Sequence, residues 1–357
     1  MHTFGSTILV SCVSQLLFSI PRLCSNLQTF TVNSWLSNNL VLEPAVFQAT
    51  CSMHSLRTLH LGSLKPPNGM MDRILHHLGH LTSLETLRGL YIPTEIQSLD
   101  ESDLILRSFG MANHWFQKLR HLSLRLQDFD SAALLMDSMH LPFLSLAFSL
   151  RLSGQPKPHS PRKLFQSLAR NSHLPLSLSS IEMLGDVRRP FVRDVDDAET
   201  ASIFQPLLAL TNLQTLSLRL SGVEKLDDAW LNRASKGFPQ LRRLTLHGHA
   251  VERKRITLAG YVPLLQNCPR LRWICTATAC KSFDTRKALP AALCNENLTA
   301  FSCSKSSIES PVASIFRCLI RMFPNLNLLF IPSSFPSEEA RKSWTDLQQL
   351  VLDSQKY

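Results

Sequence analysis

Apolar residues return along this chain in one short pattern, in which a leucine is followed by further apolar residues three and five positions later. The last three positions alternate apolar and polar residues, which predicts a short strand with one buried face. The first leucines of successive copies lie between 22 residues (Leu119 to Leu141) and 37 residues (Leu141 to Leu178) apart. The pattern occurs eleven times, beginning at Leu27, Leu56, Leu84, Leu119, Leu141, Leu178, Leu213, Leu241, Leu271, Leu298 and Leu326.

Apolar residues at helical spacing occupy several of the intervals between these strands. Such spacing predicts helices that turn one apolar face toward the strands. The candidate helices are residues 70–81, with Met71, Ile74, Leu75 and Leu78 on one face; residues 200–210; residues 259–268; and residues 312–323, with either Ile315, Leu319 and Met322 or Phe316, Ile320 and Phe323 on the buried face.

A unit of one strand and one helix cannot bury its apolar face alone, whereas stacked units share a continuous core. The repeat lengths are those of leucine-rich repeats with insertions. The Asn or Cys that regular repeats carry after the last leucine is missing from most copies, as after Leu218, where Arg219 follows. The sequence therefore predicts an α/β fold: an irregular leucine-rich-repeat solenoid, or horseshoe, with a curved parallel sheet on its concave face and helices outside.

The solenoid is expected to span residues 1–335, followed by a C-terminal capping helix in residues 336–357. Ser337, two acidic residues in the first turn and a stripe of Trp344, Leu347 and Val351 predict that helix. Two insertions break the period, a basic and proline-rich exposed loop near residues 151–163 and a second segment near residues 185–200, and a turn is expected at residues 65–69.

The N-terminal segment, residues 4–20, carries no charge. Its apolar stripes, which include Leu16 and Leu17, predict a repeat helix buried against a neighbour. A signal peptide is the alternative, but no positive residue precedes the apolar run and no A-x-A-like cleavage site follows it. No cap like the C-terminal one is visible, which suggests that an N-terminal part is missing.

Composition and motifs exclude several classes of function. The chain has 44% hydrophobic and 18% charged residues, which is unlike a disordered protein. Nine scattered Cys predict reduced, mostly buried thiols in a cytoplasmic or nuclear protein. No nucleotide-binding, hydrolase or zinc-peptidase motif occurs, so we expect no enzyme, no catalytic residue, no cofactor and no membrane span. Three weak metal candidates, each read as structural or solvated, are His76 with His80, the late cysteines with His247 and His249, and the acidic residues 194–199.

Positive charge is concentrated in one part of the chain. The formal net charge is +10, and residues 219–287 contain fourteen Lys or Arg against five Asp or Glu. Strand alternation places some of these residues, with aromatic side chains such as Phe330, on the concave face, which favours an acidic protein partner there. A solvated face without a partner and, less favoured, nucleic-acid binding stay open. The candidate partner-binding residues are His121, Arg125, Arg219, Arg243, His247 and Trp273.

Three segments carry a resemblance to a known family: the irregular repeats, the strand entries at residues 268–274 and 323–332, and the C-terminal segment 334–350. From about Leu23 onward the chain resembles the repeat regions of F-box/leucine-rich-repeat proteins of basidiomycete fungi. The resemblance implies the substrate-recognition subunit of an SCF-type ubiquitin ligase. In that family an N-terminal F-box holds a Skp1-type adaptor and the repeats hold the target protein.

This chain departs from the family pattern, because no L-P-x-E opening of an F-box precedes the repeats. A Skp1-type partner is therefore expected only if a missing N-terminal F-box exists. The sequence predicts a non-enzymatic protein–protein interaction module related to F-box target-recognition regions. The alternative is a leucine-rich-repeat scaffold or inhibitor-type protein with no ubiquitin link.

Overall fold

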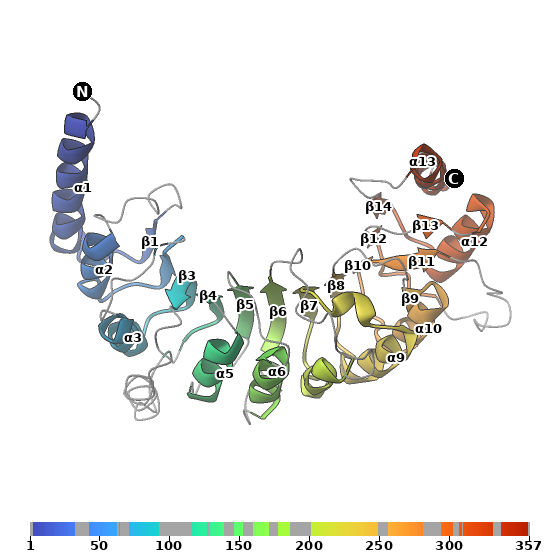
Figure 1. Ribbon diagram of the computed structural model, residues 1–357, viewed down its shortest axis with the longest axis horizontal. Coiled ribbons are helices and arrows are strands. Elements are labelled where there is room, and N and C mark those ends of the chain that lie inside the picture. The colour runs from blue at the N-terminus through green and yellow to red at the C-terminus, as the bar shows by residue number, and fades with distance from the viewer. Residues whose placement is uncertain are drawn as a thin grey trace. The chain divides into compact units, whose positions relative to one another are not determined.

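The chain forms two compact units, residues Met1–Ser177 and Leu178–Tyr357. Each unit is built from short parallel strands joined by helical or extended segments, as Figure 1 shows. The computed structural model describes residues 3–32, 43–62, 64, 71–92, 116, 118–126, 129–138, 146–152, 160–170, 178–185, 201–248, 256–280, 294–302, 307–308, 310–330 and 337–355. The expected turn at residues 65–69 and most of the insertion near residues 185–200 lie outside these ranges.

The first unit contains a parallel sheet in the order β1-β2-β3-β4-β5, the order of the strands in the chain. Helices connect most of these strands, as expected for repeats that stack one after another. The described elements are α1 (Thr3–Leu23), β1 (Thr29–Thr31), α2 (Glu43–Cys51), β2 (Thr58–His60), α3 (Met71–His80), β3 (Thr86–Ile92), β4 (His121–Leu126), α5 (Phe129–Ser138), β5 (Leu146–Leu152) and α6 (Ser160–Arg170).

The second unit contains a parallel sheet in the order β6-β7-β8-β10-β12-β14 and a smaller one in the order β13-β11-β9. Its described elements are β6 (Leu178–Leu184), η3 (Gln205–Ala209), β7 (Thr215–Arg219), η4 (Val223–Lys225), α9 (Asp228–Gly237), β8 (Arg243–His247), β9 (Ile256–Thr257), η5 (Ala259–Tyr261), α10 (Val262–Asn267), β10 (Trp273–Thr276), β11 (Thr278–Cys280), β12 (Ala300–Ser302), β13 (Ser307–Ile308), α12 (Val312–Met322), β14 (Leu328–Phe330) and α13 (Glu338–Asp353).

The strand registers align the repeat leucines with one another. Leu59 pairs with Leu87 in the first unit, and Leu216 pairs with Leu244 in the second. All four side chains are buried. This confirms the leucine-rich-repeat solenoid, because each buried leucine packs against the equivalent residue of the next repeat.

A further repeat position, which the sequence pattern missed, lies three residues before the first leucine. The N–H of Leu241 donates to the carbonyl of Phe238 (3.0 Å), and the N–H of Leu271 donates to that of Cys268 (3.1 Å). This turn places the side chain three residues before the first leucine on the buried side of the strand. Any residue type that tolerates burial can occupy that position. The buried residues at this position are Met53, Leu81, Phe116, Leu210, Phe238, Cys268, Asn295 and Phe323.

The fifth copy of the pattern was assigned to the wrong residues. The sequence pattern placed it at Leu141, Leu144 and Leu146, but β5 pairs Phe148 with Leu122 and Leu150 with Leu124. The first position of this repeat is therefore residue 145, four residues later than predicted. The intervals around it become 26 residues (145 − 119) and 33 residues (178 − 145), in place of 22 and 37.

The basic loop expected near residues 151–163 is shorter than predicted. Strand β5 continues to Leu152, and helix α6 begins at Ser160. Within that helix Leu164, Phe165 and Leu168 are buried, while Arg162 and Lys163 are exposed. The basic residues at the end of the expected loop therefore form the polar face of an amphipathic helix.

The predicted helices have the expected buried faces where their side chains are described. In α3, Ile74 and Leu78 are buried, and in α12 the buried stripe is Ile315, Leu319 and Met322. Residues 200–210 instead contain the 3-10 helix η3, and residues 259–268 contain η5 followed by the short helix α10. Pro206 and Pro263, at the first turns of η3 and α10, accompany this shortening.

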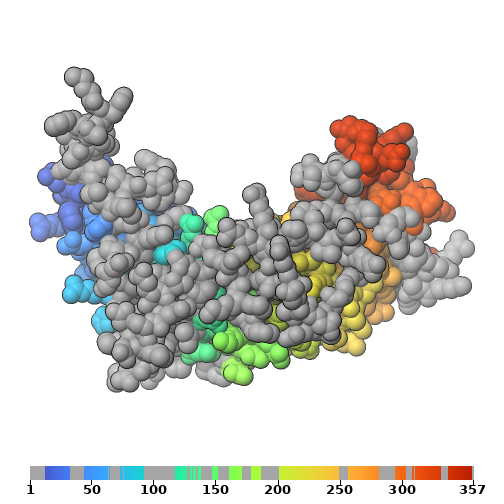
Figure 2. All heavy atoms as spheres, viewed as in Figure 1, coloured from blue at the N-terminus to red at the C-terminus, as the bar shows by residue number. Residues whose placement is uncertain are grey.

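The two terminal helices differ in how they are covered. Helix α1 packs against α2, where Leu17 is buried, but Leu16 is 60% exposed. Helix α13 lies at the C-terminal end of the second unit (Figures 1 and 2) and buries Trp344, Leu347 and Val351. Among the described helices, none has the length and apolar character needed to cross a membrane.

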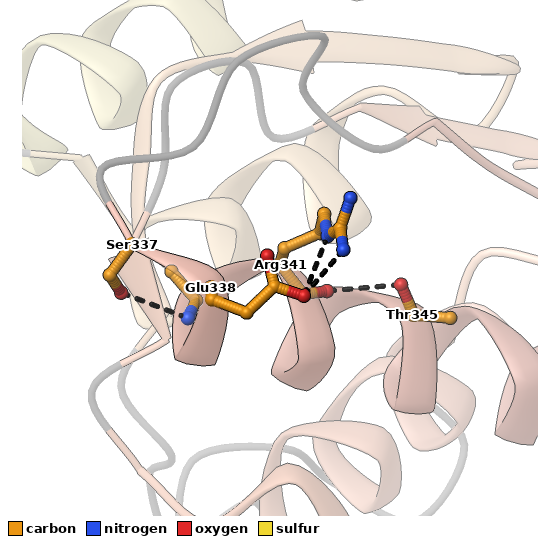
Figure 3. A network of polar contacts seen from close by, with 5 residues as sticks. Ser337, Glu338, Arg341 and Thr345 are labelled. Carbon is orange, nitrogen blue, oxygen red and sulfur yellow. Dashed lines mark hydrogen bonds and ion pairs between the residues drawn. The ribbon is translucent and has the colours of Figure 1, made fainter.

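Helix α13 begins at the residue that the sequence predicted. Ser337 Oγ accepts a hydrogen bond from the N–H of Ala340 (3.1 Å), Arg341 pairs with Glu338, and Thr345 donates to the carbonyl of Arg341 (3.0 Å), as Figure 3 shows. Further along, Gln348 Nε2 donates to the carbonyl of Leu329 in β14 (2.8 Å). The helix thereby satisfies a main-chain acceptor of the last strand as well as covering its apolar side.

Candidate functional site

The candidate site of the second unit lies on its polar face, which we define as the sheet face opposite the buried leucines. Successive side chains of a strand point to opposite faces of the sheet. Because Leu244 and Leu246 of β8 are buried, the residues on either side of them lie on the polar face. The register pairs Arg243 with Trp273 and pairs Arg219 with His247. Four of the six predicted residues therefore lie together on three adjacent strands, β7, β8 and β10.

Arg243, Trp273 and Phe330 form a continuous row on this face. The guanidinium carbon of Arg243 lies 4.7 Å from the centroid of the Trp273 ring, a cation–π geometry. The ring of Trp273 lies 5.1 Å from that of Phe330, with 48° between the two planes. The strand between them, β12, carries Ala300 and Ser302 at the matching registers, and these small side chains let the two rings meet.

The row continues into exposed apolar surface at the last strand. Phe330 is 42% exposed and Leu328 is 51% exposed, although both belong to a strand of the main sheet. Aromatic and arginine side chains on one surface are the residue types that contribute most to protein–protein binding. The polar face of the second unit is therefore basic at β8 and apolar at β14.

The arginines at β8 and β10 form no ion pairs among the described residues, although Glu182 lies on the same face at the register of Ser217. Arg242 and Arg272, at the entries of β8 and β10, are exposed, and no described residue forms an ion pair with either of them or with Arg243. Asp227 instead caps α9 by accepting from the N–H of Trp230 (2.8 Å), and Asp228 accepts from the N–H of Thr257 (2.8 Å).

The other two predicted residues, His121 and Arg125, belong to β4 of the first unit. Both lie on the polar face of that unit, because Leu122, Leu124 and Leu126 turn inward. The structure thus divides the six predicted residues into two sets, one in each unit. The pKa of His121 is lowered from its ordinary value by burial and by the positive charges of Arg88 and Arg120.

The histidine pair of α3 makes contacts within its own helix. The rings of His76 and His80 lie 4.3 Å apart, and Nδ1 of His80 lies 2.7 Å from the carbonyl oxygen of His76. Across the described ranges, no group of three or more His, Cys, Asp or Glu side chains is placed to hold a metal ion. His249 and residues 194–199, the other metal candidates, lie outside those ranges.

The late cysteines that are described belong largely to the core. Cys268 occupies the buried turn position, and its Sγ–H donates to the carbonyl of Phe238 (3.3 Å). Burial raises the pKa of the Cys268 thiol to about 12, so the thiol stays protonated at neutral pH. Cys280 and Cys318 are buried as well. Cys303 lies outside the described residues.

Sequence reasoning missed several residues of the first unit's polar face. Arg88 is followed by Gly89, where the leucine pattern breaks, and Arg151 lies in the repeat whose register was wrong. The strand registers place both close to Ser123 and Ser149. Arg151 was missed because the sequence pattern ended the strand at Leu146 and placed residue 151 in an exposed loop, whereas β5 continues to Leu152.

No protein-family model and no curated protein matches the chain. Three solved structures are similar in fold at low identity. The leucine-rich-repeat protein LegL7 of Legionella pneumophila is 12% identical, with 91% of this chain and 89% of that chain covered and a TM-score of 0.37. The Rad7 and Elc1 complex of yeast is 13% identical, with 94% of this chain and 92% of that chain covered and a TM-score of 0.41. A leucine-rich-repeat protein of Leptospira interrogans is 13% identical, with 79% of this chain and 74% of that chain covered and a TM-score of 0.34.

Proposed function

We propose that this chain is a non-enzymatic protein-recognition module that holds its partner on the polar face of the second unit. The row of Arg243, Trp273 and Phe330 carries this proposal, because it combines an unneutralised cation with exposed aromatic surface. A stacked Arg is held in place before binding, so less side-chain entropy is lost on association. The partner that fits is a protein segment with an acidic residue beside a bulky apolar one.

We further propose that the partner is a target for ubiquitination and that the chain acts as a target-recognition region related to F-box proteins, in the cytoplasm or nucleus. The sequence resemblance of the repeats and of the C-terminal segment supports this finer proposal. A scaffold or inhibitor-type repeat protein would use the same face without any ubiquitin link. The two alternatives differ in whether a Skp1-type adaptor joins the complex.

Affinity purification with mass spectrometry of the intact chain tests both proposals. Three proteins are compared: the natural chain, Arg243→Glu, and Arg233→Glu as the control with the same charge change. Arg233 is exposed on α9, in the same unit but away from the polar face. We expect the partners of the natural chain to be lost from Arg243→Glu and kept by Arg233→Glu. A Skp1-type adaptor is expected among the recovered proteins only when an N-terminal F-box is present.

Retention of every partner by Arg243→Glu would place the binding site elsewhere. Recovery of targets without any ubiquitin-ligase component would favour the scaffold. Nucleic-acid binding predicts a different result: a salt-dependent gel shift with RNA or DNA that is lost when Arg242 and Arg243 are both reversed in charge.

A further inference from the structure

The first repeat leaves side chains exposed that the next repeat buries. On α1, Leu16 is 60% exposed, Phe18 is 46% exposed and Leu23 is 77% exposed. Phe47 of α2 lies 29 residues after Phe18, which is also the interval between the first leucines of the two repeats (56 − 27). Phe47 is therefore the equivalent of Phe18, yet it is fully buried. An internal repeat is covered by its neighbours where the first repeat is open.

The turn before β1 shows the same difference. Cys24 lies three residues before Leu27 and so occupies the turn position, but it is exposed. The same position is buried at Met53 and at the other described repeats. Leu27 itself is only partly buried, whereas Leu56 is fully buried. We call these exposed residues at the outer end of α1 and β1 (Figure 1) the open end of the first unit: Leu16, Phe18, Leu23, Cys24 and Leu27.

Strand β1 has an open edge at this end. Among the described strands, β1 pairs with β2 alone. The carbonyl of Gln28 accepts from β2 and the N–H of Val32 donates to β2. Because successive residues of a strand turn their main-chain groups to opposite edges, those of Thr29 and Thr31 point to the open edge. An unpaired strand edge is a template for pairing with another strand.

The open end carries almost no charge. From residue 3 to residue 32 the sequence contains one charged residue, Arg22, although the formal net charge of the chain is +10. Two copies of so basic a chain repel each other, and the repulsion is weakest where charges are absent. A membrane-binding helix would instead carry several Lys or Arg beside its apolar face. This charge pattern favours a second copy of the chain over a lipid surface.

We propose that the open end binds a second copy of this chain about a twofold axis, with the two β1 strands paired antiparallel. The sequence Thr-Phe-Thr of β1 reads the same in both directions, so the edge is complementary to itself. Thr29 of one copy then exchanges main-chain hydrogen bonds with Thr31 of the other, and the two Phe30 residues lie opposite each other. Opposed threonine pairs and aromatic pairs both stabilise a sheet.

This axis also brings the exposed side chains of α1 together. It is perpendicular to the joined sheet, so both α1 helices stay on the side to which the buried Phe30 points. Leu16 and Phe18 of one copy then face those of the other, in helices whose dipoles run in opposite directions. A contact of this kind closes at two copies. It goes beyond the proposed function, because it uses neither the polar face nor a target protein.

Sedimentation equilibrium of the full chain over a concentration series tests the proposal. We expect the natural chain to approach twice its mass of 40.2 kDa as its concentration rises. The variant Leu16→Glu/Phe18→Glu makes like charges face each other across the axis, so the dimer dissociation constant should rise about 100-fold or more. The control Leu350→Glu/Leu352→Glu, which alters two exposed leucines of α13, should leave the dissociation constant unchanged.

A second variant, Thr31→Pro, tests the strand pairing. Proline removes an N–H that points to the open edge and that the single chain does not use in its sheet, and the residue before a proline favours the extended conformation. Thr31→Pro should therefore shift the chain toward monomers with an unchanged circular dichroism spectrum. Thr31→Val keeps the N–H and the shape of the side chain, so it should still dimerise.

Three results would overturn the proposal. The first is a natural chain that stays monomeric at every concentration. The second is a dimer that survives Leu16→Glu/Phe18→Glu or Thr31→Pro. The third is a monomeric chain that binds phosphatidylcholine vesicles through α1. Arg243→Glu should leave the dimer intact, which separates this experiment from failure of the proposed function.

Discussion

Gly89 packs directly against Gly62 of the preceding repeat. A β-carbon built on Gly89 would lie 2.5 Å from the carbonyl oxygen of Gly62, and Gly89 has a φ of +76°. The register of β3 against β4 shifts between Arg88 and Leu90, so Gly89 is the extra residue of a β-bulge. Only glycine combines that backbone angle with so close an approach.

Replacement of Gly89 by Ala should therefore destabilise the first unit. The positive φ costs about 1–3 kcal/mol for a residue with a side chain, and the contact with Gly62 adds to this cost. Urea denaturation followed by circular dichroism measures the free energy of unfolding. Thr86→Ala, at the start of the same strand, is the control and should cost less than about 1 kcal/mol. Equal stability of Gly89→Ala and the natural chain would contradict the bulge.

The sequence predicted most of the repeat registers because leucine spacing reports strand alternation directly. It failed at the fifth repeat, where Leu144 and Leu146 imitate the pattern while Phe148 and Leu150 occupy the inward positions. The error is a shift of four residues, and an even shift preserves which face each residue turns to. Alternation alone cannot detect such a shift. The wrong start did, however, produce uneven repeat lengths of 22 and 37 residues, and this unevenness indicates an error in register.

The sequence predicted some residues of the candidate sites and missed others, depending on whether the register of their repeat was predicted correctly. Arg243 and Trp273 lie in repeats whose register was read correctly, so alternation placed them on the polar face. Their stacking and the contact between Trp273 and Phe330 depend on the small residues of β12, which a one-repeat pattern does not reveal. Arg88 and Arg151 were missed because each adjoins an irregularity, the bulge in one case and the shifted repeat in the other.

Leu216→Ala should cost about 2–5 kcal/mol, because Leu216 is fully buried between the equivalent residues of two neighbouring repeats. The control is Leu184→Ala, which truncates a leucine of the adjacent strand β6 that is 39% exposed. That variant should stay within about 1 kcal/mol of the natural chain. Denaturant unfolding of the three proteins, with tryptophan fluorescence as the probe, measures both changes. Similar losses for the two leucines would mean that Leu216 is not a core position.

The C-terminal helix should behave as a cap whose removal exposes the last repeat. Trp344 belongs to α13 and is fully buried, so Trp344→Ala should cost about 3–5 kcal/mol, mainly in the last repeats. Hydrogen exchange then should accelerate at the amides of β14 and α12 before it does at β7. Leu352→Ala, on the same helix but 44% exposed, is the control and should leave exchange nearly unchanged. Uniform acceleration across the second unit would instead indicate that its repeats unfold together.

Stability of the first unit should fall as the pH drops below neutrality, because of His77. Burial, and then the charge of His54, lowers the pKa of His77 below its ordinary value of 6.5, although carbonyls of Thr50 and Met53 oppose the shift. Its Nε2 is buried without a hydrogen-bond partner, so a proton added there would be unsatisfied.

The sign of the effect follows from proton linkage. The unfolded chain binds a proton at His77 more readily than the folded chain, so the free energy of unfolding rises with pH until His77 is neutral in both states. Below pH 6.5 that stability is progressively lost, down to the lowered pKa of the folded state. Denaturant midpoints at pH 7.5 and pH 5.5 should therefore differ less for His77→Gln than for the natural chain. The remaining difference should shrink again in the double variant with His121→Gln, because the pKa of His121 is also lowered. An unchanged difference in His77→Gln would show that protonation of His77 does not oppose folding.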